Sequence, residues 1–178
     1  EQGMIVQNTP AASTRSVAEL VFAHLSGMVR FVFDANQKMP LEGDSNFKVL
    51  KKNYGAGTEL KGKTLGIIGF GRIGQEVAKI AFSYGMTVKA VDPYVESADI
   101  ELDFFDGQKV KFTIVPESMD AVLAASDFIS LHIAGAGKAV IGKAEIEKMK
   151  DNAGIINTAR GGARTSTNKA NRIKQHLS

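Results

Sequence analysis

Three glycines in the motif GFGRIG have the spacing of a turn that holds phosphate groups. Gly69 lies at the end of the apolar run LGIIGF, and Gly71 and Gly74 open a segment with helical spacing. In such a strand–turn–helix unit the first glycine allows the tight turn, the second lets the backbone approach a pyrophosphate, and the third lets the helix pack closely on the strand. The N–H groups of Arg72 and Ile73 would face the phosphates from the helix N-terminus, where the helix dipole favours negative charge.

An acidic residue completes this pattern. Asp92 ends the next predicted strand, 18 residues beyond Gly74. A carboxylate there accepts hydrogen bonds from ribose hydroxyls and repels a 2′-phosphate, which predicts NAD rather than NADP as the cofactor. The alternative is a glycine turn beside a solvated aspartate. Arg72 also has two interpretations, either a phosphate clamp or an exposed side chain that contributes only its backbone N–H.

Alternating strand and helix patterns must position this site. Apolar runs predict four strands, at residues 65–70, 87–91, 127–133 and 154–158. Helical spacing predicts three helices between them, at residues 72–84, 117–125 and 143–150. Gly85 would cap the first of these helices. This alternation predicts an α/β fold with a doubly wound parallel sheet, a Rossmann NAD-binding domain, joined by right-handed crossovers. Alternating residues at 100–115 around Asp106 and Gly107 predict a hairpin.

The segment before this unit, residues 1–60, is predicted to hold one helix and little other regular structure. Residues 1–10 form an extended entry segment, and Ser16 with Glu19 is predicted to form a capping box at the start of an amphipathic helix that ends near Phe33. Residues 34–60 are polar and lack a strong period, which predicts an arm or connecting loop, with a short helix at 47–52 as an option.

The predicted domain organisation has three parts. Residues 1–60 would form an N-terminal helix and a dimerisation arm or connector, and residues 61–162 the Rossmann domain. Residues 163–178 would be a basic tail that is disordered or non-native. The tail holds four basic and no acidic side chains, whereas the other residues hold 18 basic and 19 acidic ones. The net charge of +3 therefore belongs to the tail, which argues against a nucleic-acid-binding domain.

Other properties of the 178 residues narrow the class of protein further. The chain has no cysteine, so neither a disulfide framework nor a thiolate metal site is expected, and no metal site of another kind is predicted. No apolar run approaches the roughly 20 residues of a membrane span. These properties predict a cytoplasmic protein with no membrane partner.

The sequence resembles the NAD-binding domain of the D-isomer-specific 2-hydroxyacid dehydrogenases, closest to the D-3-phosphoglycerate dehydrogenases. Five ordered stretches carry this resemblance: NTPAASTRSVAEL, ELKGKTLGIIGFGRIGQEVAKIA, GMTVKAVDPY, SDFISLHI and MKDNAGIINTARGG. The resemblance implies that Arg72 and Ile73 bind the pyrophosphate and that Asp92 binds the adenosine ribose. The substrate stays open, because lactate, glyoxylate and formate relatives share the scaffold.

The resemblance also implies residues on the nicotinamide side. His132 and Ile133 match positions that line this side of the cleft, and Thr158, Ala159 and Arg160 match the segment beside the nicotinamide ribose. Arg160 stands where the family keeps the arginine that pairs with the substrate carboxylate and carbonyl. A guanidinium suits both tasks, since it binds a carboxylate with two hydrogen bonds and polarises a carbonyl that receives hydride. Without the motif, an arginine at a strand end is more often a structural ion-pair partner.

The family continues past this arginine with a helix and two more strands, which supply the catalytic histidine and the acid that orients it. The resemblance therefore implies that the C-terminal strands of the sheet are missing here. The chain is therefore expected to be the NAD-binding portion of an enzyme that oxidises a D-2-hydroxyacid, in serine biosynthesis by resemblance, with little turnover of its own. Neither His24 nor His176 is placed to act as the missing acid–base. In the family the first helix and the arm pack across a two-fold axis, which implies a homodimer. Two alternatives stay open: a non-catalytic NAD-binding or dimerising module, and a damaged product that does not fold stably.

Overall fold

The computed structural model describes residues 11–133 and 140–159 of the chain. Helices and strands alternate through most of this part. They are α1 (Thr14–Val29), α2 (Val32–Gly55), β1 (Thr64–Ile68), α3 (Arg72–Ser83), β2 (Thr87–Val91), β3 (Ala98–Asp103), β4 (Lys109–Ile114), α4 (Met119–Ala125), β5 (Phe128–Leu131), α5 (Lys143–Lys148) and β6 (Gly154–Asn157).

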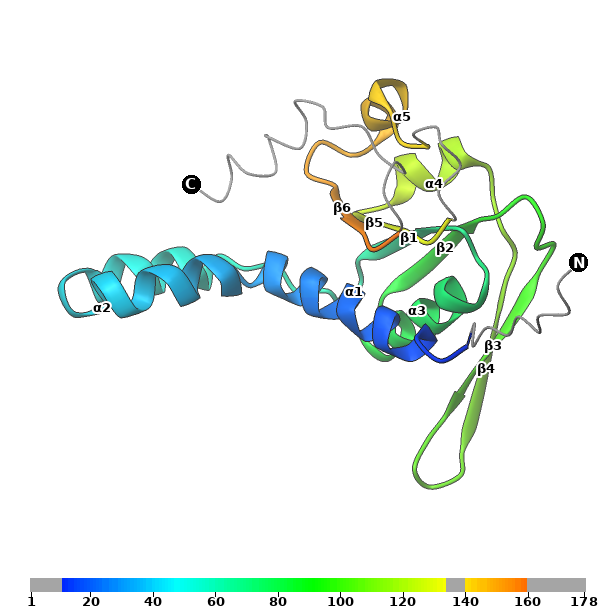
Figure 1. The fold of residues 1–178 in the computed structure, drawn as a ribbon, viewed down its shortest axis with the longest axis horizontal. Coiled ribbons are helices and arrows are strands. Elements are labelled where there is room, and N and C mark those ends of the chain that lie inside the picture. The colour runs from blue at the N-terminus through cyan, green and yellow to red at the C-terminus, as the bar shows by residue number, and fades with distance from the viewer. Residues whose placement is uncertain (1–10, 134–139, 160–178) are drawn as a thin grey trace, which may run out of the picture.

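A four-stranded parallel sheet forms the centre of the molecule, with strand order β2-β1-β5-β6. β1 and β5 are neighbours although α3, β2, the hairpin and α4 separate them in sequence, so the strand order reverses beside β1 (Figure 1). The predicted doubly wound α/β fold is thereby confirmed. The last two strands end at Leu131 and Asn157, one or two residues earlier than predicted.

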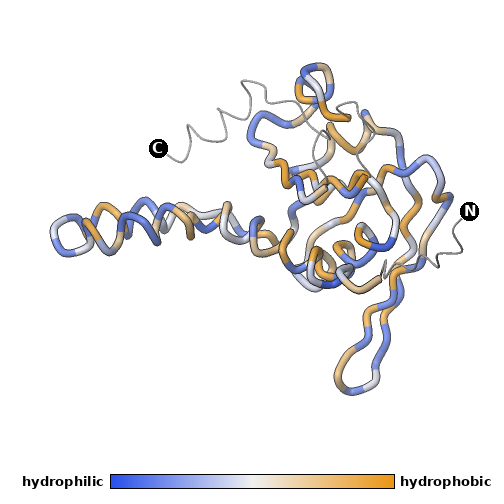
Figure 2. The backbone as a smooth tube through the Cα atoms, in the orientation of Figure 1, coloured by the Kyte–Doolittle hydropathy of each residue, from blue (hydrophilic) through white to orange (hydrophobic). Residues whose placement is uncertain are grey.

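Two apolar clusters cover the two faces of this sheet. On one face α1 and α3 pack around Leu65, Ile67 and Phe128, and on the other α4 and α5 pack around Ile129 and Leu131. Figure 1 shows these helix pairs on opposite sides of the strands, and Figure 2 shows the strands coloured mainly as hydrophobic. Strands covered on both faces are continuous apolar runs, which is why the sequence predicted them.

The polar segment after α1 is mostly helical, so the connecting loop considered for residues 34–60 is wrong, and the short helix considered at 47–52 is part of a longer one. α1 ends at Val29, and Phe31 takes a left-handed conformation with φ of 56° before α2 begins. α2 breaks at Asn46 and folds back, and the Tyr54 hydroxyl donates a 2.9 Å hydrogen bond to Asp34 near the start of the helix. The result is an arm that projects from the body (Figure 1). Leu50 is the only buried residue of α2. Because so little of this helix is buried, its sequence does not require a regular apolar stripe.

The capping box predicted at Ser16 is also wrong. α1 begins at Thr14, two residues earlier, and Ser13 precedes it without a side-chain capping hydrogen bond. Glu19 instead accepts a 2.8 Å hydrogen bond from Arg15. An early helix start places Ser16 within the first turn, where its hydroxyl cannot cap.

The hairpin predicted at 100–115 is present as β3 and β4, with Asp106 and Gly107 in its turn. Gly107 has φ of 83°, as a turn glycine should. The base of the hairpin packs on α3, where the rings of Phe82 and Phe112 stack with their centroids 4.2 Å apart. Gly85 caps α3 as predicted, with φ of 70°.

Among the described residues no single helix is long and apolar enough to cross a membrane. α1 and α2 reach that length and composition only as a pair bent by 53°.

Candidate functional site

The first glycine of the motif is held against the end of a neighbouring strand. Gly69 has φ of 92°, a conformation that side chains with a Cβ rarely adopt. A Cβ built there would lie 2.7 Å from the backbone oxygen of His132 and 3.0 Å from Ile133. The Gly69 N–H donates to the carbonyl of Val91 at 2.9 Å. The turn therefore joins the ends of β1, β2 and β5 at one edge of the sheet.

The other two glycines differ in what surrounds them. Gly74 is buried in α3, and a Cβ there would collide with the backbone oxygen of Gly69. Gly71 precedes α3 with φ of −74°, and nothing lies within 4 Å of the position its Cβ would take. Packing of the protein on itself thus requires the first and third glycines, whereas the second leaves an open approach to the backbone.

The N-terminus of α3 opens beside Gly71. No side chain caps this end, and the first turn holds no acidic residue. Arg72 is exposed and Ile73 is half-buried. The Gln75 side chain donates a 3.0 Å hydrogen bond to the Phe70 carbonyl, which braces the loop. A helix end with uncompensated N–H groups attracts anions such as phosphate.

Asp92 is bound to the glycine loop. Its Oδ2 accepts a 2.7 Å hydrogen bond from the Phe70 N–H, and its Oδ1 accepts a 2.8 Å hydrogen bond from the Tyr94 N–H. A carboxylate offers about four lone-pair positions, so two backbone donors leave capacity for two ribose hydroxyls. The carboxylate is partly exposed, which keeps it accessible.

His132 and Ile133 lie just beyond β5, where the predicted nicotinamide side would be. The His132 N–H donates to the Ile68 carbonyl at 2.8 Å, which continues the pairing of β5 with β1. On its side chain, Nε2 lies 2.8 Å from the Oγ of Ser130. Burial lowers the pKa of His132 to about 4, so the ring is neutral at pH 7. Ile133 is half-buried.

Thr158 and Ala159 follow β6 at the same edge. Leu131 pairs with Asn157 at the end of the two strands, and His132 and Thr158 are the residues that follow this pair. The Thr158 Oγ1 is buried and has no hydrogen-bond partner among the described residues. The Ala159 N–H donates a 3.0 Å hydrogen bond to the Asn157 side chain. Arg160, the predicted catalytic residue, lies outside the described residues, as does His176.

The carboxyl edge of the sheet therefore collects every predicted residue that the structure describes. The open backbone at Gly71, the helix N-terminus, the remaining acceptor capacity of Asp92 and the unpaired hydroxyl of Thr158 all fit a polar dinucleotide. The edge lies where the strand order reverses, the usual place for a ligand in such sheets. Outside this edge, His24 is exposed on α1. Within the described residues no three His, Asp or Glu side chains could hold a metal ion.

Ser130 is a site residue that the sequence reasoning missed. It is fully buried in β5, two residues before His132. Side chains two apart on a strand share a face, so the spacing alone could have paired the hydroxyl with the imidazole.

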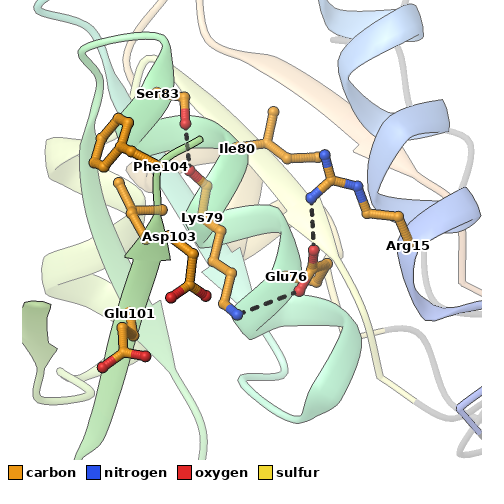
Figure 3. A pocket seen from close by; sticks show the side chains of 9 residues that line it. Arg15, Glu76, Lys79, Ile80, Ser83, Glu101, Asp103 and Phe104 are labelled. Carbon is orange, nitrogen blue, oxygen red and sulfur yellow. Dashed lines mark hydrogen bonds and ion pairs between the residues drawn. The ribbon is translucent and has the colours of Figure 1, made fainter. Parts of the chain in front are cut away.

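A separate cleft of about 470 Å³ lies between α1, α3 and β3 (Figure 3). Glu76 at its wall joins Arg15 of α1 at 2.7 Å and Lys79 at 3.8 Å. On the strand side, Glu101 and Asp103 are paired with Lys109. None of the predicted cofactor residues lines the cleft, and its charged side chains neutralise one another.

A dinucleotide-binding α/β domain is the class that this fold and this edge define. Residues 22–174 match the model of the D-isomer specific 2-hydroxyacid dehydrogenase, NAD binding domain. The chain belongs to this family, and its cofactor is NAD, as the sequence predicted.

Individual relatives agree with this assignment. The chain is 42% identical over 164 residues to the hydroxypyruvate reductase of Thermotoga maritima, covering 91% of this chain and 48% of that protein. It is 38% identical over 169 residues to the D-3-phosphoglycerate dehydrogenase of Methanocaldococcus jannaschii, covering 91% and 29%. The structure of D-lactate dehydrogenase with NAD+ from Lactobacillus jensenii superposes with a TM-score of 0.71 at 27% identity, covering 98% and 48%. The chain thus spans about half or less of the length of these relatives.

Proposed function

We propose that the chain is the NAD-binding portion of a dehydrogenase that transfers hydride between NAD and a D-2-hydroxyacid or its 2-oxoacid. The substrate class we favour is a three-carbon hydroxyacid of the phosphoglycerate or hydroxypyruvate type, since relatives with these names are 34–42% identical to the chain. A place in serine biosynthesis and a cytoplasmic location belong to the same proposal.

One observation carries this proposal. Asp92 is hydrogen-bonded to the glycine loop itself, so the group that would bind the ribose and the turn that would bind the pyrophosphate form one unit. A loosely placed aspartate beside an unrelated glycine turn would not have this contact. The contact disfavours the alternative of a solvated acid.

Each part of the edge has a role in the proposed function. The N–H groups at the start of α3 would bind the pyrophosphate, while Asp92 would accept hydrogen bonds from the adenosine ribose and repel a 2′-phosphate. His132, Ile133, Thr158 and Ala159 would line the nicotinamide side. NAD supplies the hydride chemistry when bound. We assign no proton transfer to His132, because its lowered pKa keeps it neutral and its Nε2 is engaged with Ser130.

The test is a fluorescence titration with NADH, with NADPH as the competing cofactor. The wild-type chain should bind NADH at least about tenfold more tightly than NADPH, because the Asp92 carboxylate repels a 2′-phosphate. Asp92→Ala should weaken NADH binding about tenfold or more, since charge-assisted hydrogen bonds to both the ribose and the Phe70 N–H are lost.

A matched control is available on the hairpin. Asp99 is also hydrogen-bonded and ion-paired, to Thr113 and Lys111, but it lies away from the glycine loop. Asp99→Ala should leave NADH binding unchanged. Equal affinity for the two cofactors, or an Asp92→Ala chain that binds NADH normally, would show that Asp92 does not read the ribose.

We further propose that the chain forms a homodimer through the arm α2. The arm exposes several large apolar side chains to solvent. Phe33 is 73% and Leu41 is 85% exposed, and Val32, Phe47 and Val49 are each more than half exposed. Such a surface is typical of a protein–protein contact. The family's use of this segment across a two-fold axis supports the same assignment.

Replacing Phe33 and Leu41 together by aspartate should convert the dimer to a monomer, with a dimer dissociation constant raised about a hundredfold or more. Light scattering after size-exclusion chromatography measures the change. Phe105→Asp is the control, because this side chain is fully exposed at the hairpin tip, away from the arm. A wild-type chain that is monomeric at all concentrations would refute this part of the proposal.

A further inference from the structure

We propose that Ser130 is a positioning residue that holds the imidazole of His132 in one neutral tautomer, with the proton on Nδ1. The ring would then present an N–H donor at the nicotinamide end of the edge. The expected effect of this N–H on NAD affinity rests on the proposed function, whereas the assignment of the His132 tautomer is independent of it.

The fold brings the two side chains together. Ser130 and His132 lie two residues apart at the end of β5, on the face of the sheet that Phe128 shares with α1 and α3. The Ser130 side chain is fully buried, and its Oγ lies 2.8 Å from Nε2 of His132. The backbone of His132 is fixed as well, because its N–H pairs with the Ile68 carbonyl and its carbonyl abuts Gly69.

Hydrogen-bond accounting decides the direction of this bond. Nε2 is the only partner of the Ser130 hydroxyl within residues 11–133 and 140–159. If Nε2 carried the proton, the imidazole would donate and the buried hydroxyl proton would have no acceptor, which is costly. If the hydroxyl donates, its buried proton is satisfied, and the remaining donor is the Nδ1–H of a ring that is only half-buried and is not among the fully buried unpaired polar atoms. Nε2 is then the acceptor, and the ring proton lies on Nδ1.

The low pKa of His132 agrees with this arrangement. Burial holds the pKa at about 4. Protonation would place hydrogen on both ring nitrogens, turn Nε2 into a donor, and again leave the Ser130 hydroxyl proton without an acceptor. The hydrogen bond and the burial therefore both favour the neutral ring.

A fixed Nδ1–H has a defined use at this edge. It can donate to an oxygen, and the nicotinamide riboside offers ribose hydroxyls and a carboxamide oxygen. Thr158, which follows β6 as His132 follows β5, adds a buried hydroxyl that has no partner among the described residues. We infer that His132 donates to a cofactor oxygen in the bound state, and that Ser130 keeps the ring ready to do so.

The test is nitrogen-15 NMR of the histidine side chains in the full chain, with NADH titrations of the same samples. In the wild type the His132 proton should lie on Nδ1. In Ser130→Ala the Nδ1–H to Nε2–H ratio should fall about fivefold or more, and NADH should bind about fivefold more weakly, the effect of one hydrogen bond. Ser126→Ala is the matched control, because Ser126 is equally buried but donates to the Val122 carbonyl.

A second pair of variants separates the hydroxyl from packing. Threonine and valine have nearly the same shape, so Ser130→Thr should keep the wild-type tautomer and Ser130→Val should lose it, whatever both cost in stability. A wild-type His132 with its proton on Nε2, or a tautomer ratio that is the same in the threonine and valine variants, would overturn the inference. Failure of the wild type to bind NADH would contradict the proposed function, and the tautomer ratios would still decide the role of Ser130.

Discussion

Gly69→Ala should lower the free energy of unfolding by about 3 kcal/mol or more. Two costs add at this position. The backbone has φ of 92°, which an alanine adopts only with strain of about 1–2 kcal/mol. The new Cβ would also lie 2.7 Å from the His132 oxygen, a backbone atom fixed in the sheet.

Urea denaturation followed by circular dichroism measures this loss, and Gly107→Ala separates its two parts. Gly107 has a similar φ of 83°, but nothing lies within 4 Å of its Cβ position. This control should therefore cost only the backbone strain, about 1 kcal/mol. If both variants lose the same stability, the contact between the glycine turn and β5 is not a tight one.

The sheet was predictable because its strands obey a simple physical rule. A strand covered by helices on both faces is apolar at nearly every position, and LGIIGF follows this rule at β1. The hairpin was predictable for a similar reason, since its alternation and its Asp106-Gly107 turn are local features. Such signals need no knowledge of what the segment packs against.

The arm was not predictable from the same signals. α2 packs mostly on itself, through contacts such as that of Tyr54 with Asp34, and it buries only Leu50. A helix that packs on little of the body carries no long apolar stripe, so its hydrophobic periodicity is weak, and Pro40 and Gly43 within it also disfavour helix. The exposed Phe33 and Leu41 then look like irregularities in the sequence, and only the fold shows them on one projecting element.

The candidate site also has features that the sequence predicts and features that it does not. The glycine spacing and Asp92 could be identified, because the βαβ unit fixes where the end of the second strand must lie. The hydrogen bond from Phe70 to Asp92 could not, since it joins residues 22 positions apart whose geometry depends on both turns. Ser130 was missed for another reason: a serine within a strand is ordinary until the histidine two residues later is known to be at the edge.

These contacts fix the glycine turn in place at the carboxyl edge of the sheet. Asp92, predicted to bind the adenosine ribose, holds the glycine turn from one side, and His132, predicted to line the nicotinamide side, abuts Gly69 from the other. A turn fixed in this way is preorganised, and binding then costs less ordering entropy.

Gly71→Val should abolish NADH binding, with affinity reduced about a hundredfold or more, while the chain stays folded. The position faces open space and has φ of −74°, so the protein accommodates the side chain. Replacing glycine at a helix N-cap costs only about 1 kcal/mol, a shift of roughly 2–4 °C in Tm for a chain of this size. The pyrophosphate, however, would have to occupy the space that the valine fills.

Gly55→Val provides the control, because this glycine is also exposed with nothing within 4 Å of its Cβ position, at the end of α2. It should leave the NADH affinity unchanged in the same titration. Gly71→Val that binds NADH within threefold of the wild type would place the pyrophosphate elsewhere. Loss of folding in Gly71→Val alone would show instead that Gly71, like Gly69 and Gly74, is required by the packing of the protein. The contrast between Gly69 and Gly71 thus separates the glycine that builds the turn from the glycine that receives the ligand.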